Sequence, residues 1–213
     1  MPRPVKSRAY DNSRRRGASD ERRERILAAS RELFVERGYP RTTMSAISER
    51  AGVALDTVYV LVGRKPALFR LLIETAISGA DEAIPAAERD YVRAIRAEPS
   101  ATGKLALYAD TLPAIQARLA PLVAVLQAAA AAEPELDQLW SEVSERRASN
   151  MRRLAAELAE TGHLLVPLEE AADVIWATNS PELYLLLVHQ RGWAPERYRD
   201  WLLASWQRLL LTP

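Results

Sequence analysis

The stretch TTMSAISERAGVALDTVYVLVGRK, residues 42–65, decides the fold, because it is patterned as two short helices folded across a glycine. Met44, Ile47 and Ala51 follow the spacing that places side chains on one face of a helix about two turns long. Gly52 then supplies the left-handed residue that ends a helix at little steric cost. After a turn of a few residues a second helix is expected to follow.

The second helix is expected to turn Val58, Leu61 and Val62 inward and the remaining residues wholly or partly outward. Two helices joined by a short turn that contains Gly are the components of a DNA-reading helix-turn-helix, whose second helix enters the major groove. Four of the outward residues, with polar residues that flank the two helices, are therefore candidates for DNA contact. These candidates are Thr43, Leu55, Asp56, Thr57, Tyr59, Arg64 and Lys65.

Different DNA contacts suit different members of this set. Thr57 and Tyr59 are expected on the DNA backbone or on base edges, with a packing role and a solvated hydroxyl as the alternative for Tyr59. Leu55 fits a thymine methyl group, whereas Asp56 is more readily a helix cap than a partner of a cytosine amine. The residues assigned to phosphates are Thr43, which also stands at the N-cap of the first helix, Arg64 and Lys65.

Two flanking segments extend the pattern, RERILAASRELFVERGYPRTT at residues 23–43 and VYVLVGRKPALF at residues 58–69. The order of these motifs resembles the TetR family of bacterial transcriptional regulators, over roughly the first third of the chain. The sequence departs from the usual family pattern at Ala54, where Ser or Thr is common, and at Val62, where an aromatic residue is common. The resemblance implies a DNA-binding regulator that dimerises and encloses a small molecule among its middle helices.

Composition allows a large core and excludes several classes of protein. The chain has 213 residues, of which 48% are hydrophobic, so it is long enough for one domain or two small ones. It contains no cysteine, which excludes a disulfide framework and thiolate chemistry. The basic N-terminus lacks an apolar run behind it, and no stretch approaches the ~20 uncharged apolar residues of a membrane span. We therefore expect a cytoplasmic protein without a membrane segment or a cofactor.

The net charge of +1 conceals two parts of opposite sign. Residues 1–80 carry 16 Lys and Arg against 9 Asp and Glu, a balance of +7, whereas residues 81–213 carry 13 against 19, a balance of −6. Charge runs are usually solvated faces, but the basic part coincides with the helix-turn-helix pattern. Double-stranded DNA is therefore the expected partner of the first part.

Three segments are expected along the chain. Residues 1–18 include two prolines and little apolar content, and should form a flexible basic arm that either follows DNA or is a disordered tail. Residues 19–79 should form the helix-turn-helix DNA-binding domain, and residues 80–213 a helical ligand-binding and dimerisation domain. The candidate DNA contacts of the arm are Arg14, Arg15 and Arg16.

Helical periodicity covers most of the chain, and strand-like alternation of any length is absent, so the predicted fold class is all-α. The first long helix is expected to be capped at Ser19 or Asp20 and to end at Gly38. A later helix from Lys104 is expected to break near Pro113 and again at Pro121. Further helices are predicted from Pro134, after Pro167 with a bend at Pro181, and over the residues around Tyr198 to Leu209.

The last two helices are expected to pair across a twofold axis, because they offer more apolar surface than a small bundle needs and because the resemblance places the dimer interface there. A homodimer would present two reading helices to successive major grooves, about 34 Å apart. The alternative is that the same side chains complete the core of one chain. The interface candidates are Ile175, Leu183, Leu187, Trp201, Leu202, Trp206 and Leu209.

Aromatic and polar residues on otherwise apolar helices are candidates for the wall of a ligand cavity, although each is more often an ordinary core residue. Asn179 stands out among them, because a buried amide needs hydrogen-bond partners. His163 and His189 lie in different segments without a third ligand at metal spacing, so no metal site is expected. The cavity candidates are Tyr108, Gln116, Trp140, Trp176 and Asn179.

The sequence thus predicts a transcriptional regulator, not an enzyme, and most simply a repressor that a small-molecule effector releases from a palindromic operator. A small helical enzyme is one alternative, but no nucleophile and base are spaced together and no Gly-rich phosphate cradle is present. An architectural DNA-binding protein without a ligand is another. An acidic module of about 130 residues is a large addition for that task.

Overall fold

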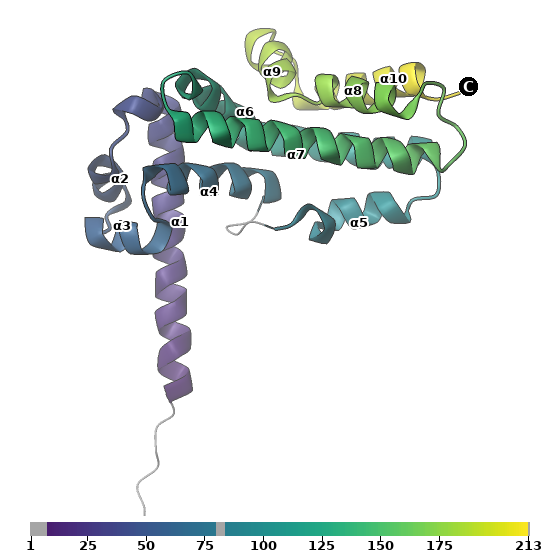
Figure 1. The fold of residues 1–213 in the computed structure, drawn as a ribbon. Coiled ribbons are helices and arrows are strands. Elements are labelled where there is room, and N and C mark those ends of the chain that lie inside the picture. Colours follow the sequence, from purple (N-terminus) through teal and green to yellow (C-terminus); the bar gives the residue numbers. More distant parts are fainter. Residues whose placement is uncertain (1–7, 80–83, 213) are drawn as a thin grey trace, which may run out of the picture. The chain divides into compact units, whose positions relative to one another are not determined.

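The computed structural model of the chain describes residues 8–79 and 84–212, with side chains from residue 17 onward (Figure 1). These residues form helices and no strand, which confirms the predicted all-α fold. In chain order the elements are α1 (Arg8–Arg41), α2 (Met44–Ala51), α3 (Leu55–Val62), α4 (Lys65–Ser78), the short 3-10 helix η1 (Ala86–Glu88), α5 (Asp90–Ala97), α6 (Ala101–Ala130), α7 (Pro134–Ala159), α8 (Leu168–Thr178), α9 (Pro181–Tyr184), the π-helical segment η2 (Leu185–Gln190) and α10 (Pro195–Leu210).

The chain divides into two compact units, an N-terminal unit that runs to Leu72 and a C-terminal unit that starts at Ile73. The division falls inside α4, whereas the sequence suggests a boundary after residue 79. Because α4 runs without interruption through this point, one helix supplies residues to both units. Leu72 and Ile73, which flank the division, are both fully buried.

The N-terminal unit is built around a cluster of three buried aromatic side chains. The ring of Phe34 on α1 lies 4.9 Å from that of Phe69 on α4 and 5.6 Å from that of Tyr39, measured between centroids. The rings of Tyr39 and Phe69 meet edge to face at 5.4 Å. Such pairs contribute about 0.5–1.5 kcal/mol each beyond the area they bury. This cluster fixes the start of α4 against the end of α1.

The N-terminal end of α1 differs from the flexible arm predicted over residues 1–18. The helix begins at Arg8, so Ser19 and Asp20 lie inside it and do not cap it. Residues 8–18 contain no proline, and adding residues to an existing helix avoids the unfavourable step of nucleation. At the other end, Gly38 interrupts the helical backbone with φ 76° and ψ 169°, as predicted. Residues 1–7 lie outside the described residues.

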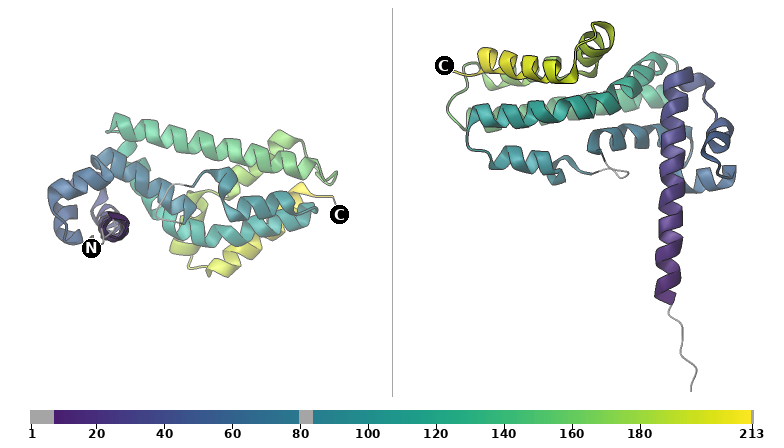
Figure 2. Two further views of the ribbon diagram at one scale, coloured as in Figure 1. Left: turned by 90° about the horizontal axis from the view of Figure 1, so that it is seen from below. Right: turned by 180° about the vertical axis from the view of Figure 1, so that it is seen from behind.

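In the C-terminal unit, α6 and α7 run side by side, and α8 and α10 pack against them (Figures 1 and 2). Trp206 of α10 is completely buried, and its ring stacks on that of Tyr108 of α6 at 5.7 Å. Tyr198, also completely buried, meets the ring of Tyr184 edge to face. The core of this unit is therefore continuous from α6 to the last helix.

The helix breaks predicted at Pro113 and Pro121 are wrong, because α6 runs unbroken from Ala101 to Ala130. A proline inside a helix costs about 3 kcal/mol. Burial of a leucine side chain contributes about 1.5–3 kcal/mol. Packing against α7 and α10 therefore outweighs the two prolines. The leucines that α6 buries are Leu105, Leu112, Leu119, Leu122 and Leu126.

Among the described residues, α6 is also the one helix long and apolar enough to cross a membrane by length and composition. The sequence predicts no membrane span here, because Asp110 and Arg118 leave no stretch of ~20 residues without charge. In the structure α6 lies against α5, α7, α9 and α10, and residues along its whole length are buried by them. Its apolar character is accounted for by this packing.

The remaining helix ends agree with the signals in the sequence. α7 begins at Pro134, and the turn after it carries Gly162 with φ 76°. The predicted bend at Pro181 is a complete break: α8 ends at Thr178, and Ser180 caps α9 by accepting a hydrogen bond from the amide of Leu183. α10 begins at Pro195 after a short turn.

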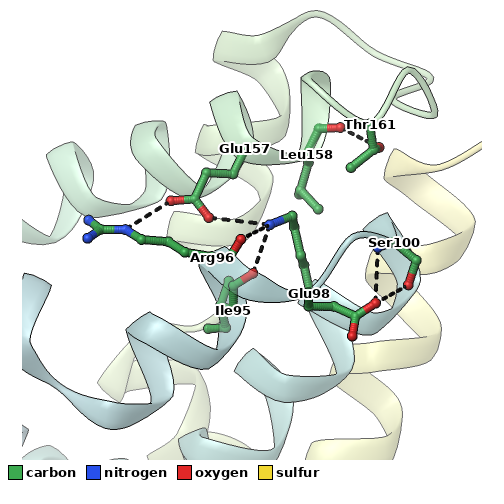
Figure 3. Close-up of polar contacts among 8 residues, drawn as sticks. Ile95, Arg96, Glu98, Ser100, Glu157, Leu158 and Thr161 are labelled. Atoms are coloured by element: carbon green, nitrogen blue, oxygen red, sulfur yellow. Dashed lines mark hydrogen bonds and ion pairs between the residues drawn. The ribbon is translucent and has the colours of Figure 1, made fainter.

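A buried lysine ties α5 to α6 and α7 (Figure 3). The ammonium of Lys104 donates to the carbonyl of Ile95 at 2.8 Å and to that of Arg96 at 3.3 Å, both in the last turn of α5. It also lies 3.7 Å from a carboxylate oxygen of Glu157 on α7. A cation at the C-terminal end of a helix interacts favourably with the helix dipole and with carbonyls that lack partners within the helix.

Candidate DNA-reading surface and effector cavity

Local hydrogen bonds set the geometry of the helix-turn-helix. Thr43 caps α2 as predicted, and its hydroxyl accepts from the amide of Ala46 at 3.1 Å. Gly52 ends α2 in the left-handed conformation, with φ 62° and ψ 39°. The hydroxyl of Ser48 donates to the carbonyl of Val53 at 2.6 Å, which fastens α2 to the turn. The N-cap position of α3 is Ala54, which makes no side-chain hydrogen bond.

The two helices are held on α1 by buried and charged contacts. The hydroxyl of Thr42, fully buried, lies 3.0 Å from the carbonyl of Leu33 and 2.9 Å from that of Gly38. Arg50 of α2 pairs with Glu32 at 2.9 Å and with Glu36 at 3.5 Å. These contacts hold α2 against α1.

Three apolar side chains of α3 remain exposed once its inner face is packed. Val58 and Val62 are buried and Leu61 is half-buried, close to the expectation from spacing. Leu55 is 37%, Tyr59 43% and Val60 82% exposed. Because these three side chains gather on one short helix, they form an apolar patch of the kind that marks interaction sites.

The predicted DNA contacts lie around this face, and Val60 joins them. Asp56 and Arg64 are exposed, and Thr57 is half-buried. Val60 is missing from the set chosen from the sequence, although its position opposite Val58 and Val62 on a helix indicates that it points outward. An apolar side chain at such a position suits a thymine methyl group.

The residues predicted to hold phosphates flank α3. Thr43 is exposed at the start of α2. Lys65 begins α4 half-buried, with its ammonium 4.0 Å from the ring centroid of Tyr39, a cation–π contact that fixes the position of its charge. Arg14, Arg15 and Arg16 lie in α1, and their side chains are outside the described part of the structure. A shallow hollow on the N-terminal unit is lined by Met44, Tyr59, Gly63, Arg64, Lys65 and Pro66.

The C-terminal unit contains a cavity of about 340 Å³ between α5, α6 and α7, with contributions from α4 and from the break between α8 and α9. Most of its wall is apolar, as in small-molecule sites generally. Four of the five predicted residues line it. These are Tyr108, Gln116, Trp140 and Asn179, whereas Trp176 is not part of the wall.

One end of the cavity is polar and is organised by Asn179. Its side-chain amide donates to the hydroxyl of Tyr108 at 2.5 Å and lies 2.9 Å from the sulfur of Met151. Its backbone carbonyl accepts from the side-chain amide of Gln116 at 2.5 Å. Burial raises the pKa of the Tyr108 hydroxyl above its ordinary value, so that group is neutral and acts as a hydrogen-bond donor or acceptor.

Arg147 of α7 completes the polar end and is absent from the set chosen from the sequence. One terminal nitrogen, Nη1, donates to the carbonyl of Trp176 at 2.6 Å and to the side-chain oxygen of Asn179 at 2.7 Å. The guanidinium lies 4.4 Å from the ring centroid of Trp176, so Trp176 supports the wall from behind. A signal was present in the sequence, since Arg147 shares an apolar stripe with Val143 and Met151 at four-residue spacing.

A salt bridge at the cavity wall joins α7 to α4. Arg146 and Glu74 approach to 2.8 Å, and both residues line the cavity. On the same helix the carbonyl of Ala76 accepts from the guanidinium of Arg118 on α6 at 3.1 Å. The last turns of α4 are thus held by charged groups of the C-terminal unit.

Three of the predicted dimer contacts are wrong for the chain as it is folded. Ile175, Leu202 and Trp206 are completely buried within the chain, because they lie on the inner faces of α8 and α10. Of the other four, Trp201 is 37% and Leu209 53% exposed. Leu183 and Leu187 are half-buried. Spacing identified the helices, but could not tell which of their apolar faces packs inward.

No group of three or more His, Asp or Glu side chains able to hold a metal ion occurs in the described ranges. The imidazole of His189 packs against the ring of Tyr184, and the backbone carbonyl of His163 accepts from Thr212. The arrangement that remains is a helix-turn-helix in one unit and a mostly apolar cavity in the other. This combination is typical of the class of helical transcriptional regulators.

Comparison with known proteins assigns the helix-turn-helix region to a family. Residues 26–71 match the family described as bacterial regulatory proteins, tetR family. The HTH-type transcriptional activator FasR of Mycolicibacterium smegmatis is 35% identical over 69 residues, which cover 30% of this chain and 32% of that protein. The chain therefore matches about a third of the length of this curated relative. Residues 26–71 therefore form a DNA-binding domain of the TetR family of regulators, as the helix-turn-helix sequence predicts.

Solved structures match over nearly the whole chain. NalD, the secondary repressor of the MexAB-OprM multidrug efflux pump in Pseudomonas aeruginosa, superposes with a TM-score of 0.68 at 19% identity, over 92% of this chain and 98% of that one. A complex of SmeT with triclosan gives a TM-score of 0.63 at 19% identity, over 90% and 92% of the two chains. At these identities the likeness shows the shared fold alone.

Proposed function

We propose that this TetR-family regulator is a cytoplasmic homodimeric repressor that binds a palindromic operator through α3 and leaves it when a small molecule enters the cavity. The exposed face of α3, held on a packed helix-turn-helix, carries the proposal. Leu55, Tyr59 and Val60 offer apolar contacts to bases, and Thr57 offers a hydroxyl. Thr43, Arg64 and Lys65 flank the face at places suited to phosphates.

α4 gives the effector a route to the DNA-reading helices. Its last turns line the cavity through Glu74 and Ile77, and its first turn follows α3 after Gly63. A molecule that displaces Glu74 from Arg146 would change how α4 is held in the C-terminal unit. Since α4 is continuous, such a change is transmitted to the unit that carries α3.

The names of similar proteins support repression more than activation. NalD is described as a repressor, and the SmeT structure contains triclosan, which supports a cavity that accepts organic molecules. FasR is described as an activator, but the similarity to it covers only about a third of either chain. A reporter fused to the regulated promoter gives the sign: deletion of the regulator should raise transcription.

The test is gel retardation with the DNA immediately upstream of the coding region. The full chain should retard this duplex at low salt, and unrelated DNA only at higher protein concentration. Tyr59→Ala removes an exposed side chain of α3 and should weaken retardation without lowering the unfolding temperature. Leu165→Ala, also at an exposed position but outside the N-terminal unit, is the matched control. Equal retardation by both variants would contradict the assignment of α3.

A further inference from the structure

The wall of the cavity carries more positive than negative charge. Five arginines and two glutamates line the cavity in the described part of the chain. Arg146 pairs with Glu74 and Arg96 with Glu157, so both carboxylates are already matched. The remaining arginines of the wall are Arg89, Arg147 and Arg153. A cavity with this wall favours a bound anion over a bound cation.

Among these three, Arg147 is the one that bonds to Asn179 at the polar end. It is half-buried, whereas Arg153 is exposed. Arg89 is half-buried too, but donates to the carbonyl of Ile84 and to the hydroxyl of Tyr91. The Arg147 guanidinium meets only neutral acceptors through Nη1 and makes no ion pair within 4.0 Å among the described residues.

Arg147 keeps its positive charge and has N–H groups that are not used in the hydrogen bonds described above. Burial lowers the pKa of Arg147 and the carboxylate of Glu182 opposes that shift, but a guanidinium is not deprotonated in proteins. Its five N–H groups form a planar fork, of which Nη1 uses two for Trp176 and Asn179. Stacking on Trp176 fixes the plane of the fork. Nε and Nη2 match the two oxygens of a carboxylate.

A second group at the same end also lacks a partner. The side-chain oxygen of Gln116 makes no hydrogen bond among the described residues, although the residue is only 3% exposed. Its orientation is fixed, because only the amide nitrogen can donate to the carbonyl of Asn179. Buried acceptors are normally satisfied. The polar end therefore also has an unused acceptor, which an ionised carboxylate cannot satisfy, so recognition of an anion rests on the donors of Arg147.

We propose that the effector is an organic acid with an apolar body, whose carboxylate pairs with Arg147 at the Asn179 end of the cavity. The apolar body occupies the part lined by side chains such as Ile95, Leu112 and Val143. This inference rests on the proposed function, because it names the chemical class of the molecule that enters the same cavity. It adds the residue that selects the class.

The experiment compares three probes with one apolar body and different head groups: octanoate, 1-octanol and octylammonium. Binding to the full chain is measured by titration calorimetry at neutral pH. Octanoate should bind at least about ten-fold more tightly than octanol, because a charge-assisted bidentate pair forms only with the acid. Octylammonium should bind most weakly. Equal binding of octanoate and octanol, or no binding of octanoate, overturns the proposal.

Variants assign the effect to one residue. Arg147→Met should reduce octanoate affinity to that of octanol and leave octanol affinity unchanged. Arg153→Met, on the exposed rim of the same wall, should preserve the preference for the acid. If Arg147→Met keeps the preference, Arg147 is not the carboxylate site.

A measurement on the unmodified protein covers the case in which Arg147→Met does not fold. Phenylglyoxal modifies accessible arginines, and mass spectrometry locates the modified residues. Octanoate should slow modification of Arg147 but not of Arg153, and octanol should protect neither. Protection of neither residue by octanoate overturns the proposal. Gel retardation of operator DNA by the same preparation is independent of these outcomes, so failure of the acid site and failure of the DNA-binding function are distinguishable.

Discussion

Two glycines close the turns of the N-terminal unit, and the structure ranks how much each is needed. Gly52 has φ 62° and ψ 39°, a conformation that other residues adopt at a modest cost. Gly63 has φ 75° and ψ −156°, a region that is essentially restricted to glycine. A Cβ at Gly63 would also lie 3.3 Å from the Cβ of Ala67, whereas at Gly52 the nearest atom is 3.8 Å away.

Gly63→Ala should therefore destabilise the protein more than Gly52→Ala. We expect a loss of about 1–2 kcal/mol for Gly52→Ala and about 2–3 kcal/mol for Gly63→Ala in the free energy of unfolding. Urea denaturation followed by circular dichroism measures both. Equal losses would mean that the backbone at residue 63 can relax into an ordinary conformation.

Lys65 lends itself to a test of phosphate contact. Lys65→Ala should weaken binding to operator and to unrelated DNA alike, and should reduce the slope of log affinity against log salt by about one unit. Fluorescence anisotropy over a series of salt concentrations measures the slope. Arg208→Ala, in the last turn of α10, is the control and should leave the slope unchanged. An unaltered slope in Lys65→Ala would remove this residue from the phosphate contacts.

The sequence predicts a residue's role correctly where that role depends on neighbours in the chain. The cap by Thr43 and the left-handed Gly52 involve partners within a few positions, so their patterns are readable. Arg147 depends on Trp176 and Asn179, about thirty residues away on another helix. No local pattern contains that pairing, and only the presence of a charge in an apolar stripe hints at it.

At the scale of elements, Lys104 bonds to the last turn of α5, a helix that forms part of the cavity wall. Lys104→Met keeps most of the apolar stem but leaves the carbonyl of Ile95 without its partner. The expected loss is about 1–3 kcal/mol in the free energy of unfolding. Arg93→Met, on the exposed side of α5, should change stability by less than about 0.5 kcal/mol. Similar losses in both variants would refute the role given to Lys104.

The Glu74–Arg146 salt bridge allows a test of how α4 is held when no effector is bound. Glu74→Gln keeps the shape of the side chain and removes the charge that pairs with Arg146. If the bridge stabilises the DNA-binding state, operator affinity should fall about 2- to 30-fold, the range of 0.5–2 kcal/mol that such contacts contribute to coupling. Gel retardation without ligand measures it, with Glu170→Gln on α8 as the control. Unchanged affinity would show that α4 is positioned by its apolar contacts alone.

Whole elements were predicted well where packing and propensity agree, and poorly where they conflict. The helix-turn-helix, α7 and α10 follow their end signals. α6 continues through Pro113 and Pro121 because its packing on α7 and α10 outweighs the cost of two prolines inside a helix. Burial of Leu202 and Trp206 could not be predicted either, since α10 is apolar on more than one face.

At the scale of the whole molecule, exposed apolar residues of α10 predict the contact of a homodimer. Trp201→Glu with Leu209→Glu should convert a dimer into a monomer, because two charges would be buried in an apolar interface. Light scattering after gel filtration measures the mass. Leu165→Glu, 55% exposed and outside α10, should leave the dimer intact. A dimer that survives the double change would place the twofold contact elsewhere.

The shared helix α4 has a consequence for the nucleic acid itself. Coupling between two binding sites is reciprocal at equilibrium. If the small molecule lowers the affinity for the operator by some factor, the operator lowers the affinity for the small molecule by the same factor. Operator DNA therefore acts as an antagonist of effector binding. Chains seated on their operator would then release bound effector more readily than chains free in the cell, and the threshold for induction would depend on how many operators the cell contains.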